Sequence, residues 1–287
     1  VAQRAQLIGS IRPGQLAPEQ PQNGEPRTGL SMGDHAAITA RELKVTRADQ
    51  DQLALESHQK LHQAWEEGFF TDLTTGYLGV NRDTNLRADS TLEKLGQLKP
   101  VFGKRDAQQH GTQATMTAGN STPLTDGASV ALLGNEDWAA QHNLEPLAYL
   151  VDSETAAVDF IHGGDGLLMA PTYAVPRLLE RNGLSLQDFD FYEVHEAFAS
   201  QVLATLTAWE DETYCRERLG LPGALGPIDR TKLNVKGSSL AAGHPFAATG
   251  TRILATTAKI LEENGGGRAL ISICAAGGQG VAAIVEH

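Results

Sequence analysis

Three short segments combine side chains that can move protons with stretches of accessible backbone. The first is EVHEAFA, residues 193–199, in which a strand-like run leads into a helical one with His195 and Glu196 at the junction. A histidine at such a junction is a candidate acid or base, although a histidine that merely caps a surface helix fits the same pattern. Both roles stay open for this segment taken alone.

The second segment is NVKGSSLAAGHP, residues 234–245, which brings His244 to the start of a helix expected from Pro245. The positive end of a helix dipole disfavours imidazolium, so we expect His244 to be neutral near pH 7 and able to accept a proton. The small side chains before it allow a ligand or another backbone to approach closely. A general base is the favoured role, and a structural histidine is the alternative.

The third segment is ICAAGGQG, residues 273–280, where Cys274 ends a strand just before a glycine-rich turn. A free cysteine is often only a small buried apolar residue. However, the backbone amides at Ala276 and Gly277 could donate to a developing oxyanion, and the thiol beside them could serve as nucleophile or as acid and base. A dinucleotide site is excluded because a strand, rather than a helix, follows the glycines.

The elements around these segments alternate between strand and helix. Thr46 should cap a long helix with Asp49 three residues on. Strands are expected at 128–133, 147–151 and 189–194, helices at 136–142, 173–181, from about 196 and from 245, and a hairpin at 269–275 and 281–285. The alternation predicts a layered α/β fold with a mixed sheet covered by helices.

Composition excludes several classes of function. The 287 residues carry a net charge of −12, so no positive field is available for nucleic acid. The longest apolar runs are far shorter than the roughly 20 residues of a membrane-spanning helix. Two cysteines fit a reducing interior better than a disulfide scaffold. We expect no metal site.

Three other stretches lie outside the segments that could do chemistry. The chain begins with Val1 and a helix-compatible VAQRAQLI, followed by a proline-rich arm at 12–30, so we expect a fragment or a processed chain. Residues 70–118 are polar and irregular, which is typical of a lid, and residues 207–233 are expected to include an insertion.

Together and in this order, HEAF (195–198), GHPF (243–246) and CAAGGQG (274–280) resemble the thiolase family, especially the β-subunit branch of the fatty-acid oxidation trifunctional complex. Residues 31–33 (SMG), with the helix TRADQDQLALESHQ, are similar to the thiolase loop domain, and 117–128 are similar to its exit. The likeness extends over nearly the whole chain from about residue 28.

The resemblance implies a layered α-β-α-β-α fold with mixed sheets and an incomplete N-terminal half. We expect four parts along the chain: the end of the N-terminal half with a linker (1–27), the loop domain (28–118), the last strand and helix of the N-terminal half (119–142), and the C-terminal half (143–287).

The resemblance also implies an acetyl-CoA C-acyltransferase of fatty-acid β-oxidation. Such an enzyme cleaves 3-ketoacyl-CoA thiolytically to acetyl-CoA and a shortened acyl-CoA, or runs the reverse condensation. Acyl-CoA and CoA would be substrates, with no permanently bound cofactor. A homodimer or homotetramer, a hydratase/dehydrogenase α subunit as partner, and the bacterial cytoplasm or the mitochondrial matrix follow as expectations.

Roles for matching residues are implied in the same way. His244 would deprotonate the reactive cysteine, Cys274 would shuttle protons, and His195 would replace the asparagine that supports an oxyanion in most thiolases. The expected contacts to coenzyme A are Met32, Ser153, Ala197 and Phe198.

This sequence departs from the family pattern in three ways. Ala247 and Ser238 stand where the family commonly has glycine, which could narrow the pocket. Family members carry the nucleophilic cysteine upstream of Met32 in a small-residue segment that is not found here. Cys215 lies in the charged stretch ETYCRER and does not fit that pattern, so we expect this chain alone to be inactive.

Two other readings remain. A ketosynthase-like condensing enzyme shares the layered fold and a cysteine–histidine chemistry, but it would end with an Asn- and Phe-containing glycine loop where this chain has Cys274. A non-catalytic thiolase-like subunit that binds acyl-CoA or a partner is the second alternative. The intact His195 and His244 argue against it.

Overall fold

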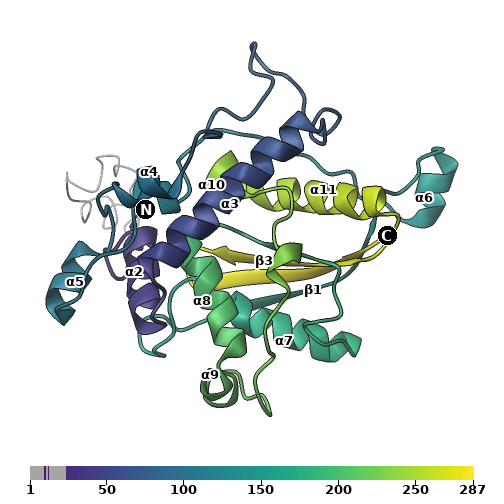
Figure 1. Ribbon diagram of the computed structural model, residues 1–287. Coiled ribbons are helices and arrows are strands. Elements are labelled where there is room, and N and C mark those ends of the chain that lie inside the picture. Colours follow the sequence, from purple (N-terminus) through teal and green to yellow (C-terminus); the bar gives the residue numbers. More distant parts are fainter. Residues whose placement is uncertain (1–9, 11, 13–23) are drawn as a thin grey trace.

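A single mixed sheet lies at the centre of the computed structural model, which describes residues 10, 12 and 24–287 (Figure 1). Its strands are β1 (Tyr149–Ala157), β2 (Phe191–Val194), β3 (Arg268–Ala275) and β4 (Gln279–Glu286). Their order is β1-β4-β3-β2. The two pairings of β4 are antiparallel, whereas β2 runs parallel to β3. The prediction of a mixed sheet is confirmed.

Helices cover the sheet and extend beyond it. They are α2 (Met32–Glu42), α3 (Arg47–Glu66), α4 (Leu92–Gly96), α5 (Lys104–His110), α6 (Glu136–Gln141), α7 (Pro171–Asn182), α8 (Ala199–Glu210), α9 (Glu212–Glu217), α10 (Ser239–Ala242) and α11 (Ala247–Asn264). Short 3₁₀ turns occupy Ala118–Asn120 and Arg230–Lys232. As predicted, Thr46 caps α3, because its side chain accepts a hydrogen bond from the amide of Asp49.

The alternation of side chains along β3 and β4 divides the core into two faces. Ala269, Ile271 and Val285 pack with residues of α11. Leu270 and Ile284 belong instead to the cluster that includes residues of α7 and α8. Successive strand residues point to opposite faces, so the sheet lies between α11 on one side and α7 with α8 on the other, as Figure 1 shows.

Residues 128–133, expected to form a strand, do not form one. Val130, Leu132 and Leu133 are 88%, 73% and 68% exposed, and no described strand pairs with the segment. A strand needs a neighbouring strand to form hydrogen bonds with its amide and carbonyl groups, and an apolar sequence does not by itself provide one. The assignment of a last strand within 119–142 is therefore wrong, whereas the helix expected there is present as α6, which stands away from the sheet in Figure 1.

Other boundaries shift for local reasons. Helix α11 begins at Ala247 rather than Pro245, because Phe246 has φ +37° and acts as the residue before the helix. The strand expected at 147–151 is β1, which starts two residues later and continues to Ala157. The helix suggested by VAQRAQLI lies outside the described residues. The expected domain boundaries remain predictions.

Candidate active site

The ends of two parallel strands bring His195 and Cys274 to the same edge of the sheet. Val194 of β2 pairs with Ser272 of β3, and the amide of His195 donates to the Ser272 carbonyl at 2.8 Å. Cys274 follows Ser272 by two residues. The carboxyl ends of parallel strands in such sheets are where reacting groups commonly gather.

The buried carboxyl of Glu196 holds the chain in place just after β2. It accepts hydrogen bonds from Ser57 Oγ at 2.6 Å, from Asn234 Nδ2 at 2.8 Å and from the amide of Leu240 at 3.2 Å. Burial raises the pKa of Glu196, although these hydrogen bonds act in the opposite direction. Glu196 thereby ties α3 and α10 to the end of β2, which positions its neighbour His195.

The imidazole of His244 lies against that of His195. The ring centroids are 4.4 Å apart, and Nδ1 of His244 lies 2.6 Å from Thr249 Oγ1 in the first turn of α11. Burial, followed by the positive charge of Arg252, lowers the pKa of His244 to about 4. The ring is therefore neutral at pH 7, as expected.

His195 is buried, with 1% of its surface exposed. Burial is the first cause that holds its pKa well below the ordinary value, and the nearby His244 and Arg252 act in the same direction. Its Nδ1 lies 3.0 Å from Ser239 Oγ. Its Nε2 is buried and has no hydrogen-bond partner among the described residues. A buried polar atom left free in this way is suited to a group that binds from outside.

Cys274 sits in an apolar cluster. Its neighbours there include Met116, Leu168 and Phe198, and burial raises the pKa of the thiol to about 12. A thiol with that pKa is protonated at neutral pH, so it can donate a proton but is not a standing thiolate. The other cysteine, Cys215, is also buried, with its Sγ near the carbonyls at the end of α8, and its pKa is raised by burial.

Three of the four residues expected to contact coenzyme A gather beside Cys274. Met32, at the start of α2, packs into the same cluster as Ala197 and Phe198. Ser153 is placed elsewhere: it is exposed on the outer strand β1, opposite Ala283 of β4. Along β1 it lies three residues, or about 10 Å, from the position opposite Gly280, the residue that pairs with Cys274.

The turn between β3 and β4 presents its backbone at the surface. Ala276 and Gly277 are both exposed, and Gly277 has φ +79°, a conformation that glycine adopts without strain. Gly278 is buried. A Cβ at this position would lie 2.8 Å from the carbonyl oxygen of Val158, so there is no room for a side chain. The close approach of residues 158 to 160 fixes the turn next to Cys274.

Several polar residues of the site were missed from the sequence. Ser239 contacts His195, Thr249 contacts His244, and Arg252 donates to Ser239 from the second turn of α11. Ser57 reaches Glu196 across 139 positions of sequence. Serine and threonine are too common to stand out. Arg252 could have been noticed, because it follows His244 by eight residues on a helix that is otherwise poor in charge at its start.

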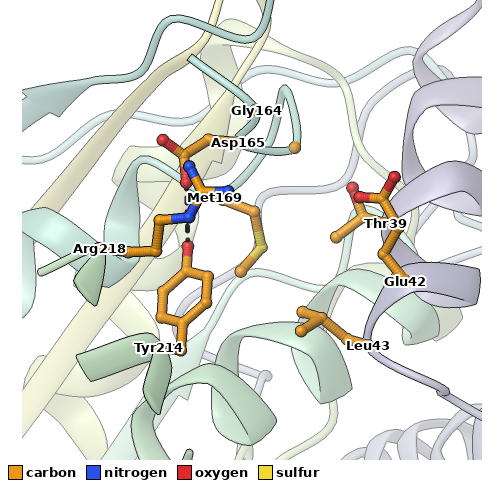
Figure 2. A pocket seen from close by; sticks show the side chains of 9 residues that line it. Thr39, Glu42, Leu43, Gly164, Asp165, Met169, Tyr214 and Arg218 are labelled. Atoms are coloured by element: carbon orange, nitrogen blue, oxygen red, sulfur yellow. Dashed lines mark hydrogen bonds between the residues drawn. The ribbon is translucent and has the colours of Figure 1, made fainter. Parts of the chain in front are cut away.

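A separate cavity of about 330 Å³ lies between α2 and α9. Figure 2 shows Thr39, Glu42 and Leu43 on one side and Asp165, Tyr214 and Arg218 on the other. Asp165 is already engaged by the hydroxyls of Tyr173 and Tyr214. None of the histidines or cysteines discussed above lines this cavity, so it is distinct from the site at the strand ends.

A metal centre and a membrane-spanning helix are two further kinds of feature to consider among the described residues. The described residues contain no group of three or more His, Cys, Asp or Glu side chains arranged to hold a metal ion. Among the same residues, no helix combines the length and the apolar character needed to cross a membrane.

Two family models together match most of the chain. Residues 23–137 match the thiolase N-terminal domain and residues 144–287 match the thiolase C-terminal domain. Curated relatives include a 3-ketoacyl-CoA thiolase of Yersinia enterocolitica, 41% identical over 292 residues, and one of Yersinia pestis, 42% identical. Each alignment covers the whole of this chain but only 65% of the relative's length.

Solved structures show the same similarity. The acetyl-CoA acetyltransferase of Bacillus anthracis matches 96% of this chain and 68% of its own, with a TM-score of 0.76 and 31% identity. Human mitochondrial 3-ketoacyl-CoA thiolase matches 92% of this chain and 62% of its own, with a TM-score of 0.72 and 32% identity. The thiolase-like fold predicted from the motifs is confirmed, and the chain belongs to the thiolase family.

Proposed function

We propose that the complete protein is an acetyl-CoA C-acyltransferase. It cleaves 3-ketoacyl-CoA with CoA to give acetyl-CoA and a shortened acyl-CoA, or runs the reverse condensation. The observation that carries the proposal is the contact between the neutral rings of His195 and His244 at the sheet edge that also ends in the protonated thiol of Cys274. The names of the relatives support the same reaction.

In the first half-reaction, His244 takes the proton of a reactive cysteine, and the resulting thiolate attacks the 3-keto carbon. His195 and the backbone at Ala276 and Gly277 stabilise the oxyanions that form. The bond between C2 and C3 then breaks, and Cys274 gives its proton to C2, which releases acetyl-CoA. A thiol with a pKa of about 12 suits the protonation of a strongly basic carbanion.

In the second half-reaction, the Cys274 thiolate takes the proton of an incoming CoA thiol. The CoA thiolate attacks the acyl-cysteine, the shortened acyl-CoA forms, and the departing enzyme cysteine takes back its proton from His244. Splitting one difficult step into two in this way is the advantage of covalent catalysis.

The acylated cysteine is neither of the two in this chain. Cys274 has the protonation role, and Cys215 is fully buried near the end of α8. We assign the nucleophile to a part of the protein outside these 287 residues. The relatives have room for it, because this chain spans only 65% of their length.

The pantetheine arm of coenzyme A would run along Met32, Ala197 and Phe198, which form an apolar wall beside Cys274. Ser153 remains a candidate contact only if the arm extends to the outer strand. Coenzyme A is a substrate here, and the chemistry asks for no bound cofactor.

Assembly and compartment follow as parts of the same proposal. We assign the protein to a homodimer or homotetramer, with a hydratase/dehydrogenase α subunit as a further partner. Both cysteines are free thiols, which suits the bacterial cytoplasm or, in a eukaryote, the mitochondrial matrix.

The test is a thiolysis assay on the full-length polypeptide that contains this chain. Purified protein, 3-ketoacyl-CoA and CoA should yield acetyl-CoA and the shortened acyl-CoA in equal amounts, measured by mass spectrometry. Tight binding of the substrate without any product would favour the non-catalytic subunit instead.

A further inference from the structure

The side chains of Arg252 and His195 converge on the hydroxyl oxygen of Ser239. The guanidinium of Arg252 donates from Nη2 to Ser239 Oγ at 2.7 Å, and the same Oγ lies 3.0 Å from Nδ1 of His195. Ser239 is 0% exposed, and the Nε atom of Arg252 is itself buried. The three groups form a line from α11 through α10 to the end of β2, in which Ser239 and His195 are buried and Arg252 is half-buried.

The direction of each hydrogen bond in this line follows from which of the three side chains carry hydrogen on the atoms that meet. An arginine side chain can only donate, so Ser239 Oγ must accept from Arg252. Within the described part of the chain, Oγ has no other partner than His195 Nδ1 to which its own hydrogen can point. If Nδ1 carried a proton, the buried hydroxyl would accept twice and its hydrogen would have no acceptor, which is costly in a dry interior.

We propose that Arg252 and Ser239 are positioning residues that fix the tautomer of His195 with Nδ1 as acceptor and the proton on Nε2. The positive charge of Arg252 polarises the Ser239 hydroxyl and strengthens its donation to Nδ1. The buried Nε2, which has no partner among the described residues, is then a permanent N–H donor.

With this tautomer, His195 and His244 have different roles. His195 cannot accept a proton at Nε2, because that nitrogen already carries one, so it serves as a hydrogen-bond donor to a carbonyl oxygen or oxyanion. The ring of His244 forms its hydrogen bond with Thr249 and not with Arg252 or Ser239. His244 is left as the base. This catalytic consequence rests on the proposed function, whereas the tautomer itself does not.

The test is the ¹⁵N spectrum of the histidine rings in the full-length polypeptide that contains this chain, because such a spectrum distinguishes a ring nitrogen that bears hydrogen from one that does not. Comparison with a His195→Asn variant assigns the His195 signals. We expect His195 to carry its proton on Nε2 in the native chain. A spectrum with the proton on Nδ1 would overturn the inference.

Two variants test the cause. Ser239→Ala removes the donor to Nδ1 and should give a mixture of the two tautomers, while Ser239→Thr keeps a hydroxyl and should restore the native spectrum. An unchanged single tautomer in a folded Ser239→Ala protein would show that the Arg252–Ser239 line does not set it. Arg252→Met should act in the same direction, and if that buried change prevents folding, the serine pair still decides the matter.

The outcome can be separated from that of the proposed function. The spectrum needs no substrate and no nucleophilic cysteine, so it stands even if the full-length protein shows no thiolysis. Conversely, thiolysis by a protein with the proton on Nδ1 would leave the proposed function intact and refute this inference alone.

Discussion

The rings of His195 and His244 meet at 4.4 Å between centroids and at an interplanar angle of 55°, with Arg252 close behind them. Two imidazolium ions cannot share such a buried position, because each charge disfavours the other. The pair is therefore kept neutral, and the protons on its nitrogens are placed by hydrogen bonds.

Replacing His244 should abolish most turnover without unfolding the protein. General bases contribute roughly 10²- to 10⁴-fold to rate, so His244→Ala in the full-length enzyme should lower kcat at least about a hundredfold. His62→Ala is the matched control, since His62 is 42% exposed on α3 and should leave kcat unchanged. Near-normal thiolysis by folded His244→Ala would remove this residue from the mechanism.

Cys274→Ala should cause a loss of similar size, because it removes the thiol proposed to protonate C2. The measurement is single-turnover formation of acetyl-CoA. Cys215→Ala should keep kcat while lowering stability, since it removes a fully buried side chain that has no role in the proposed chemistry. Equal losses of kcat in the two folded variants would mean that the thiols have been assigned wrongly.

The Cys274 thiol should resist alkylation in the native chain. Its pKa is raised from 9.0 to about 12, so the thiolate that reacts with iodoacetamide is scarce at pH 8 and becomes more abundant as pH rises. Mass spectrometry should show Cys274 unmodified at pH 8 in native protein and modified in urea. The raised pKa also contributes stability that is complete below pH 9 and lost as pH rises towards 12. Fast native alkylation at pH 8 would contradict the buried setting.

Acid should destabilise the fold through the buried histidines. The pKa of His244 falls from 6.5 to about 4 on folding, so the unfolded chain binds protons more readily between these values and stability is lost as pH drops below 6.5. His58 behaves in the same way, with a pKa lowered to about 4. The melting temperature should decline between pH 6.5 and pH 4, and less steeply in His244→Asn. Parallel curves for the two proteins would show that His244 titrates normally.

Glu196 should be coupled to Ser57 in stability. Hydrogen bonds to charged groups are worth about 1.5–3 kcal/mol, so Ser57→Ala should lower the free energy of unfolding by about that amount. Urea denaturation of Ser57→Ala, Glu196→Gln and the double variant gives the coupling. Strict additivity would mean that this pair does not hold the turn after β2.

The sequence predicted correctly those elements that depend on neighbouring residues, and it failed where an element depends on residues far away in the sequence. The cap at Thr46, helix α7 and the hairpin of β3 and β4 are set by nearby residues, and all were predicted. The strand expected at 128–133 was wrong because pairing depends on a distant partner that composition does not reveal. The insertion expected at 207–233 includes Trp209 and Cys215, both 0% exposed, so part of it belongs to the core.

The candidate site shows the same contrast. The motifs around His195, His244 and Cys274 were visible because rare residue types stand beside glycine and alanine. Ser57 and Ser239 were not, because they reach the site across α3 and α10 only once the chain has folded, and Arg252 was overlooked although its place eight residues after His244 was a usable signal.

The most direct test of the whole account is peptide mapping of the full-length protein after brief reaction with 3-ketoacyl-CoA in the absence of CoA. We expect one shortened acyl group on a cysteine outside these 287 residues, with Cys274 and Cys215 unmodified. Cys274 stays unacylated because its proposed role is to give a proton to C2. An acyl group on Cys274 or Cys215 in a protein that also performs thiolysis would contradict the account and make this chain the carrier of the nucleophile.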